Sequence, residues 1–269
     1  MVQLEYNEFK NVVNFFSENK YQIPALAVLN GNFPGRVFVD NRDKPEIAVV
    51  WAISRWSYIA CKNLLPEHRD FISDVFNKEI IPIIKEVGEE RFEFYADNSI
   101  KWDTVLNESL QQEYQICKHY ENTFLLNKQK FETFASNLEV CKDIDIYERA
   151  YPIIPEEYQK YVTCDEVEKK VFVMAIKKNG KIVSQCLNNG FVHGDNYFID
   201  LDTFDNQERN KGYGTLISCK LISNQLKKGL LPLWETTVDN LPSQRVANKL
   251  GFEIVDEYPV YSIAAYKGG

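Results

Sequence analysis

The chain has 269 residues, of which 45% are hydrophobic and 13% aromatic, with only 12 glycines and 10 prolines. Such a chain can form one large or two modest domains with hydrophobic cores, and its composition excludes disordered, collagen-like and low-complexity proteins. The formal net charge of −8 argues against nucleic-acid binding, because phosphate contacts require a basic surface. This charge weakly favours a cationic partner such as an amine.

The cysteines and histidines do not indicate a metal site. The six cysteines are isolated from one another, no Cys-x-x-Cys pair occurs, and the chain has three histidines. We therefore expect reduced thiols and no bound metal. The N-terminal segment lacks a basic stretch followed by an apolar run, and no stretch approaches about 20 apolar residues. These features predict a cytoplasmic protein without a membrane segment, and they leave its oligomeric state open.

The N-terminal half begins with an amphipathic pattern. Residues 1 to about 30 carry apolar side chains at three- and four-residue spacing, which predicts a helix. Two β-rich segments, 37–39 and 47–51, then flank the stretch DNRDKP. Because this stretch is rich in turn-forming residues, we predict a β-hairpin.

Residues 64 to about 134 return to a helical pattern. It is interrupted by Pro82 and by a possible strand at residues 91–95. No flexible linker follows, but the pattern then changes. We predict an N-terminal, helix-rich α/β domain over residues 1–135 and a second domain over residues 136–269. The first domain has no readable motif.

The second domain opens with two hairpin signals. Segments 171–176 and 181–186 flank an Asn-Gly pair at 179–180, which suits a type I′ turn because both central residues need positive φ. The polar turn 193–196 then precedes a strand at 197–203. Further elements follow in this order: helix 215–229, strand 231–238, helix 240–250, and strands 252–258 and 260–266. The sequence therefore predicts an α+β fold.

The segment 209–214, Arg-Asn-Lys-Gly-Tyr-Gly, fits the pattern R-x-x-G-x-G between a strand and a helix. Glycines let a ligand approach the backbone, and the free N–H groups at a helix start attract an anion such as a pyrophosphate. Alone this motif is weak evidence, because a plain turn looks the same. A dinucleotide fingerprint would need a third glycine where Ile217 stands, and a P-loop would need Gly-Lys-Ser/Thr.

A second motif follows on the next strand and helix after the glycine loop, and the combination of the two motifs is specific. Asn240, Ser243 and Ala247 lead to Leu-Gly-Phe at 250–252. Together, the two motifs resemble those of the GNAT acetyltransferases, whose glycine loop cradles the CoA pyrophosphate and whose following helix flanks the pantetheine arm. The segments PLWETTVDNLPSQRVANKLGF and GNFPGRVFVDNRDKPEIAVVW are more closely similar to the zwittermicin A resistance branch. In that branch the N-terminal half would be a degenerate GNAT-like domain. The resemblance thus implies that residues 136–269 form the catalytic domain and that residues 1–135 are non-catalytic and shape the acceptor site.

The resemblance implies a mixed, mostly antiparallel sheet flanked by helices, with acetyl-CoA lying where strands 197–203 and 230–238 splay apart. It implies no metal. The acceptor would be the amine of a small molecule, such as an aminated antibiotic or metabolite. The residues expected to contact acetyl-CoA are Leu201, Asp202, Thr203, Arg209, Asn210, Lys211, Gly212, Tyr213, Gly214, Thr215, Asn240 and Ser243.

An acceptor amine is mostly protonated at neutral pH, since its free pKa is near about 10, so a base or a water chain must take its proton. The candidate bases are Asp200, Asp202 and Glu235. The two aspartates share one face of their strand by two-residue alternation. For all three, a solvent-facing strand carboxylate remains the alternative.

Many GNAT enzymes have a tyrosine at the position of Ala247, where it protonates the departing thiolate. Alanine cannot do this, and Ser243, one helical turn earlier, is our candidate for the role. Its alternative role is to cap the helix. The missing tyrosine also leaves open a catalytically silent CoA-binding module. A two-domain aminoacyl-transfer enzyme is disfavoured because tRNA recognition does not suit a charge of −8.

Overall fold

The computed structural model describes residues 1–17, 19–97, 101–138, 145–148, 154–162 and 171–265. The chain forms two compact units. Unit 1 comprises Met1–Tyr120, Ile154–Cys164 and Tyr258–Gly269, and unit 2 comprises Glu121–Ile153 and Asp165–Glu257. The predicted division after residue 135 therefore falls inside unit 2, and the C-terminal segment of the chain belongs to unit 1.

Unit 1 is built on the strand order β1-β2-β3-β4-β5-β12, in which only β4 and β5 are parallel. Its strands are β1 (Val2–Gln3), β2 (Gly35–Val39), β3 (Ile47–Ala52), β4 (Ser57–Cys61), β5 (Arg91–Ala96) and, from Tyr258 onward, β12 (Phe252–Ala265). Its helices are η1 (Tyr6–Asn11), η2 (Val13–Phe15), η3 (Lys20–Gln22), α1 (Ile23–Leu29), α2 (His68–Val75), η4 (Phe76–Ile80), α3 (Ile81–Glu86), α4 (Trp102–Leu110) and η5 (Glu156–Tyr161).

Unit 2 is built on the order β6-β11-β10-β9-β8-β7, in which only β10 and β11 are parallel. Its strands are, from Glu121 onward, β6 (Tyr114–Leu126), then β7 (Asp145–Glu148), β8 (Val173–Lys178), β9 (Lys181–His193), β10 (Asn196–Thr203) and β11 (Leu231–Thr237). Its helices are α5 (Lys128–Ser136), η7 (Asn206–Glu208), α6 (Tyr213–Leu226) and α7 (Leu241–Lys249). The expected mixed, mostly antiparallel sheet flanked by helices is confirmed.

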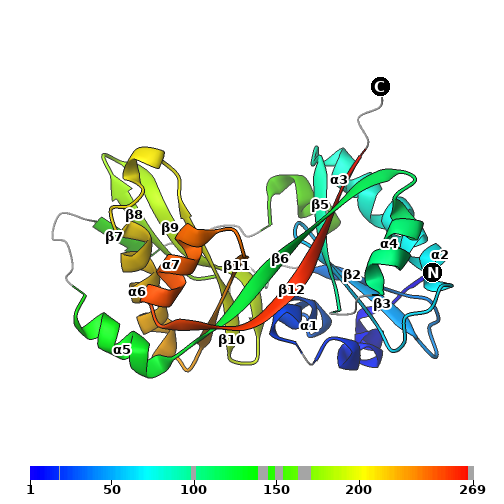
Figure 1. Ribbon diagram of the computed structural model, residues 1–269, viewed down its shortest axis with the longest axis horizontal. Coiled ribbons are helices and arrows are strands. Elements are labelled where there is room, and N and C mark those ends of the chain that lie inside the picture. Colours follow the sequence, from blue (N-terminus) through cyan, green and yellow to red (C-terminus); the bar gives the residue numbers. More distant parts are fainter. Residues whose placement is uncertain (18, 98–100, 139–144, 149–153, 163–170, 266–269) are drawn as a thin grey trace. The chain divides into compact units, whose positions relative to one another are not determined.

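Both halves of the chain run through the same order of elements (Figure 1). Three antiparallel strands lead to a helical segment, a parallel strand, a second helix and a long final strand. The final strands are exchanged: β6 of the first series pairs with β11, and β12 of the second pairs with β5. This repetition supports the prediction of a GNAT-like N-terminal half.

The long N-terminal helix was a wrong prediction. The apolar residues that suggested it are buried, among them Leu4, Phe9, Val12 and Phe16. Leu4 follows β1, Phe9 lies in η1, and Val12 and Phe16 directly follow η1 and η2. Among the described residues of this segment, α1 alone is α-helical. A spacing of three residues suits the 3₁₀ helix as well as the α-helix, so the apolar pattern did not distinguish them. At Leu4 the backbone N–H donates to the carbonyl of Val37 in β2, which keeps this residue out of a helix.

Two long strands were also predicted wrongly. The segment 114–126 was assigned to helix but forms β6, because it finds its partner in β11, far along the chain. The two final strands are one strand, β12, which continues through Pro259. The strand β4 was not predicted. The hairpins β2–β3, β8–β9 and β9–β10 are confirmed, with φ of 51° at Asn179 and 78° at Gly180.

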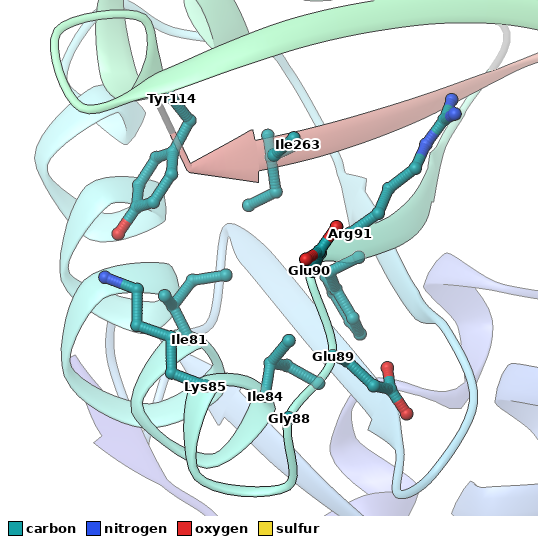
Figure 2. Close-up of a pocket in the computed structure, with 11 residues that line it drawn as sticks. Ile81, Ile84, Lys85, Gly88, Glu89, Glu90, Arg91, Tyr114 and Ile263 are labelled. Carbon is teal, nitrogen blue, oxygen red and sulfur yellow. The ribbon is translucent and has the colours of Figure 1, made fainter. Parts of the chain in front are cut away.

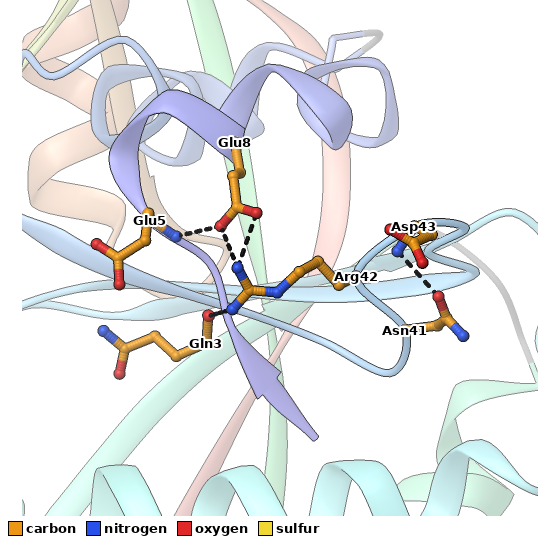
Figure 3. A network of polar contacts seen from close by, with 6 residues as sticks. All are labelled: Gln3, Glu5, Glu8, Asn41, Arg42 and Asp43. Atoms are coloured by element: carbon orange, nitrogen blue, oxygen red, sulfur yellow. Dashed lines mark hydrogen bonds and ion pairs between the residues drawn. The ribbon is translucent and has the colours of Figure 1, made fainter.

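The turn between β2 and β3 is tied to the N-terminal segment (Figure 3). The Arg42 guanidinium donates to both carboxylate oxygens of Glu8, at 2.9 and 3.0 Å, and to the Gln3 carbonyl at 3.2 Å. The same Glu8 carboxylate accepts the backbone N–H of Glu5 at 2.8 Å. The irregular N-terminal segment is thus fixed by the hairpin.

The core of unit 2 lies on one face of its sheet, beneath α5, α6 and α7. Four apolar residues of α6 are buried there: Leu216, Ile217, Leu221 and Ile222. Trp234 of β11 and Ile199 of β10 belong to the same core, so their strand neighbours at 200 and 235 face the opposite side. The sheet therefore separates a helix-covered face from a carboxylate-bearing face.

Candidate functional site

The parallel strands β10 and β11 part halfway along their length. Their pairing runs from Asn196 opposite Leu231 to Ile199 opposite Trp234. Beyond this last pair the described residues of β10 and β11 form no further ladder, although β10 continues to Thr203. Backbone groups of both strands are thereby left available to a ligand that lies between them.

The alternation of β10 decides which of its residues face this opening. The N–H of Phe204 donates to the Val183 carbonyl on the β9 side at 3.1 Å. Leu201 and Thr203 must then direct their backbone groups the other way, toward β11. The Thr203 carbonyl accepts Nε of Arg209 at 3.3 Å, whereas the carbonyl of Asp202 accepts the Ser184 hydroxyl at 2.9 Å. Leu201 and Thr203, rather than Asp202, therefore present backbone groups to the opening.

The glycine loop leads directly into α6. Gly212 is the residue before the helix, at φ 80°, and no side chain caps the helix start. Asn210 also has a positive φ, of 60°. A Cβ built on Gly214 would lie 3.1 Å from Cδ2 of Leu201. The loop thus presents the first N–H groups of a 14-residue helix without a side chain in front of them, which suits an anion.

The charges beside the loop are organised by Glu208. Its carboxylate accepts Nζ of Lys178 at 2.8 Å and Nζ of Lys211 at 2.9 Å. These two hydrogen bonds, that of Lys178 foremost, lower the pKa of Glu208 to about 2. Glu208 therefore holds one cation of the loop, Lys211, and one of β8, Lys178, in place at neutral pH.

Because the pKa of Glu208 is lower in the folded than in the unfolded protein, its contribution to stability is present above the unfolded value, near 4.5. It is lost as the pH falls toward about 2. We expect Glu208→Gln to lower the melting temperature at pH 7, and the difference from wild type to shrink below pH about 4.5. Circular dichroism melts across this range test it. In a background carrying Lys178→Met and Lys211→Met, Glu208→Gln should not change the melting temperature at any pH. If the difference between Glu208→Gln and wild type stays constant on acidification, the two lysine contacts are not what stabilises the Glu208 carboxylate.

The candidate bases gather on the face away from the helices. Asp200 and Glu235 are the residues that follow the last pair of β10 and β11, and Asp202 lies two residues further along β10. The two aspartates are exposed and Glu235 is half-buried. Thr123 of β6 pairs with Glu235 and is fully buried. The structure thus brings Asp200 and Glu235 together at the mouth of the opening.

Ser243 lies on the other face, in the first turn of α7. Its backbone N–H bonds to Oδ1 of Asn240 at 3.2 Å, so Asn240 is the residue that caps the helix. The hydroxyl of Ser243 instead accepts Nε1 of Trp234 at 2.9 Å. Ala247 is fully buried in the core. The contact with Trp234 was not predicted from the sequence.

Unit 1 contains a cavity of about 580 Å³ beside α3, β5 and β12 (Figure 2). Ile81, Ile84 and Ile263 give it apolar walls, and Lys85 points toward the ring of Tyr114. None of the predicted site residues lines it. The cavity therefore has no part in the site built on β10 and β11.

Two further sequence expectations concern what the protein lacks. Within the described ranges, no group of three or more His, Cys, Asp or Glu side chains is placed to hold a metal ion. No helix in the same part of the chain is long and apolar enough to cross a membrane.

Comparisons with known proteins agree with this geometry. The family model of the GNAT acetyltransferases matches residues 14–261. An uncharacterized N-acetyltransferase of Bacillus subtilis, YdfB, is 21% identical over 96% of this chain and 97% of its own. A GCN5-related N-acetyltransferase-like protein from Streptococcus suis has a similar structure, with a TM-score of 0.68 and 18% identity over 96% of this chain and 98% of its own. A tandem GNAT protein from the clavulanic acid biosynthesis pathway aligns over 100% of this chain and 99% of its own, with a TM-score of 0.59 and 10% identity. The chain therefore belongs to the GNAT acetyltransferase family and is an acyltransferase.

Proposed function

We propose that the protein transfers the acetyl group of acetyl-CoA to the amine of a small molecule. The observation that carries this proposal is the parting of β10 and β11 beside an uncapped helix start. An extended amide chain, such as pantetheine, can hydrogen bond to Leu201 and Thr203 as an added strand does. The N–H groups at the start of α6 are then within the same ligand's reach for its pyrophosphate.

The glycine loop would hold the phosphate end. We expect Arg209, Asn210, Lys211, Gly212, Tyr213, Gly214 and Thr215 to contact it. Arg209 is exposed and Lys211 is held by Glu208, so the loop offers positive charge in front of the helix start. Backbone N–H groups of β10 would stabilise the oxyanion that forms when the amine attacks the thioester.

Asp200 and Glu235 are our proposed candidates for receiving the amine's proton, directly or through water, with Asp202 as the more distant carboxylate. All three lie on the face opposite to Ser243. An ammonium group would be attracted to this acidic face and would need to lose its proton there before attack. The amine would thus approach from one side of the sheet and the leaving sulfur would depart toward the other.

Unit 1 should hold no second CoA molecule. The pairing of its parallel strands β4 and β5 ends at Ile59 and Ala96. Just beyond, the Asp97 carboxylate accepts the indole N–H of the fully buried Trp102. Burial, aided by Asp97, raises the pKa of the neighbouring Cys61 thiol to about 12. The end of this pairing thus holds a contact between the protein's own side chains, and residues 1–135 carry no R-x-x-G-x-G segment. We therefore expect no CoA there and expect residues 1–135 to shape the acceptor site.

The finer assignments are proposals that rest on resemblance. We place the chain in the zwittermicin A resistance branch, with an aminated antibiotic or metabolite as acceptor and the cytoplasm as its compartment. A screen for thiol release from acetyl-CoA with kanamycin, spermidine, tyramine and lysine as acceptors tests this class. The buried Ala247 favours one alternative, a CoA-binding module without catalysis. Such a module would bind acetyl-CoA but release no thiol with any amine.

The cofactor assignment predicts which substitutions weaken acetyl-CoA binding. Arg209→Ala removes a charge-assisted contact of about 1.5 to 3 kcal/mol, so we expect the Kd to rise about tenfold to a hundredfold. Gly214→Val places a branched side chain against Leu201 and at the ligand's approach, and should abolish measurable binding. Calorimetry with acetyl-CoA measures both.

The matched control is Arg69→Ala, which removes an exposed arginine of unit 1 that pairs with Glu108 at 3.0 Å. We expect its Kd to equal that of the wild type. If Arg209→Ala and Gly214→Val bind acetyl-CoA as tightly as this control, the loop is not the pyrophosphate site.

A further inference from the structure

The first turn of α7 is fixed by side chains other than that of Ser243. Oδ1 of Asn240 takes the backbone N–H of Ser243, and the amide of Gln244 donates to the carbonyls of Thr237 and Val238, at 3.2 and 2.8 Å. These bonds tie the helix start to the end of β11. The Ser243 hydroxyl is therefore not needed to cap the helix, and its position is set by its surroundings.

The indole of Trp234 determines how this hydroxyl can act. An indole N–H only donates, so the Ser243 oxygen must be the acceptor in the 2.9 Å contact. A serine hydroxyl has one proton, which is then directed elsewhere. Among the described residues no acceptor for that proton is found. Trp234 is buried and its ring packs on that of Phe252, 5.5 Å between centroids, so it holds the hydroxyl firmly.

The Trp234–Ser243 pair lies beside the opening between β10 and β11. Trp234 is the last residue of β11 that pairs with β10, so the side chain that holds the hydroxyl starts at the point where the strands part. In the proposed function the reactive end of acetyl-CoA lies in this opening. Of the two faces of the sheet, Ser243 occupies the one opposite to the candidate bases.

We infer that Trp234 is a positioning residue, which orients the Ser243 hydroxyl as a hydrogen-bond donor to the sulfur leaving from acetyl-CoA. The inference rests on the proposed function. As the amine nitrogen bonds to the acyl carbon, the carbon–sulfur bond breaks and its electron pair passes to sulfur. Ser243 stabilises that charge while keeping its own proton, because an alkyl hydroxyl is a far weaker acid than a thiol. The amine's proton, released through base and water, completes the free thiol.

The test is the ionisation of the CoA thiol bound to the full-length protein, followed by thiolate ultraviolet absorbance as the pH is raised. A donor to the thiolate lowers the pKa of that thiol. We expect Ser243→Ala to raise it by about one unit relative to the wild-type complex, and Trp234→Phe to raise it in the same direction. The double variant should add nothing to Ser243→Ala, and Ser243→Thr, which keeps a hydroxyl, should titrate as wild type.

Trp51→Phe is the matched control. Trp51 is likewise fully buried, but its Nε1 has no hydrogen-bond partner in the described part of the chain. Its replacement should leave the titration of bound CoA unchanged. If Ser243→Ala and Trp234→Phe both bind CoA in calorimetry and titrate as wild type, the inference is overturned while the proposed function stands. If wild-type protein does not bind CoA at all, the proposed function itself has failed.

Discussion

Replacing Gly251 by alanine is expected to lower the free energy of unfolding by about 3 kcal/mol. Gly251 ends α7 at φ 88°, a conformation that costs other residues about 1 to 2 kcal/mol. A Cβ there would also lie 2.8 Å from the backbone N of Phe131 and 2.9 Å from Cβ of Lys130. These atoms belong to the first turn of α5 and cannot move without loosening the contact between the helices. The Gly251 carbonyl accepts the N–H of Asn127 in the same contact.

Urea denaturation of the full-length protein measures this effect, and Gly229→Ala is its control. Gly229 has a similar φ of 82°, but a Cβ built on it meets no atom within 4 Å. Its replacement should lower the free energy of unfolding by the backbone strain alone, about 1 kcal/mol. Equal losses for the two variants would show that α5 does not press against Gly251.

The Leu-Gly-Phe motif could be recognised from sequence, but its packing partner could not. Local signals identified much of unit 2: the Asn-Gly turn at 179–180, the stop of α6 near Gly229 and the stop of α7 at Gly251. Each depends on the backbone preference of one or two residues. Such signals hold whatever the rest of the chain does.

The missed elements depend on distant partners. The strand β6 is stabilised by pairing with β11, more than 100 residues away in sequence, from Glu121 opposite Thr237 to Leu125 opposite Leu233. Its apolar and polar residues do not alternate strictly, so no local period separated it from a helix. The exchange of β6 and β12 also explains why one boundary in the sequence could not describe the two units.

Part of the candidate site could be predicted from the sequence. The glycine loop is recognisable from its motif, and the parting of the strands was implied by the family resemblance. In the structure Nε of Arg209 donates to the Thr203 carbonyl, which links the loop to the end of β10. Which face each carboxylate occupies also follows from alternation. The contact between Trp234 and Ser243 does not, since it depends on the angle at which α7 returns across β11.

The exchanged strands lead to the second large effect, which concerns the isolated fragment 136–269. This fragment lacks β6 and almost all of α5. Phe124 and Phe131, both buried in the core of unit 2, would be missing, and β11 would become an unprotected edge. Loss of two large aromatic side chains costs about 3 to 5 kcal/mol each, which approaches the whole stability of a typical domain. We therefore expect the fragment to aggregate or to unfold without a cooperative transition.

A second fragment, 121–257, provides the comparison, because it keeps the part of β6 that pairs with β11 and all of α5. It omits the last part of β12, whose partner β5 belongs to unit 1. Expressed side by side, 121–257 should be the more soluble and should show the sharper thermal transition by circular dichroism, and it should retain acetyl-CoA binding. A soluble, cooperatively folded 136–269 would show that β6 is dispensable for unit 2. Full activity of that fragment with any amine would further show that residues 1–135 do not shape the acceptor site, because the acceptor would then be recognised by residues 136–269 alone.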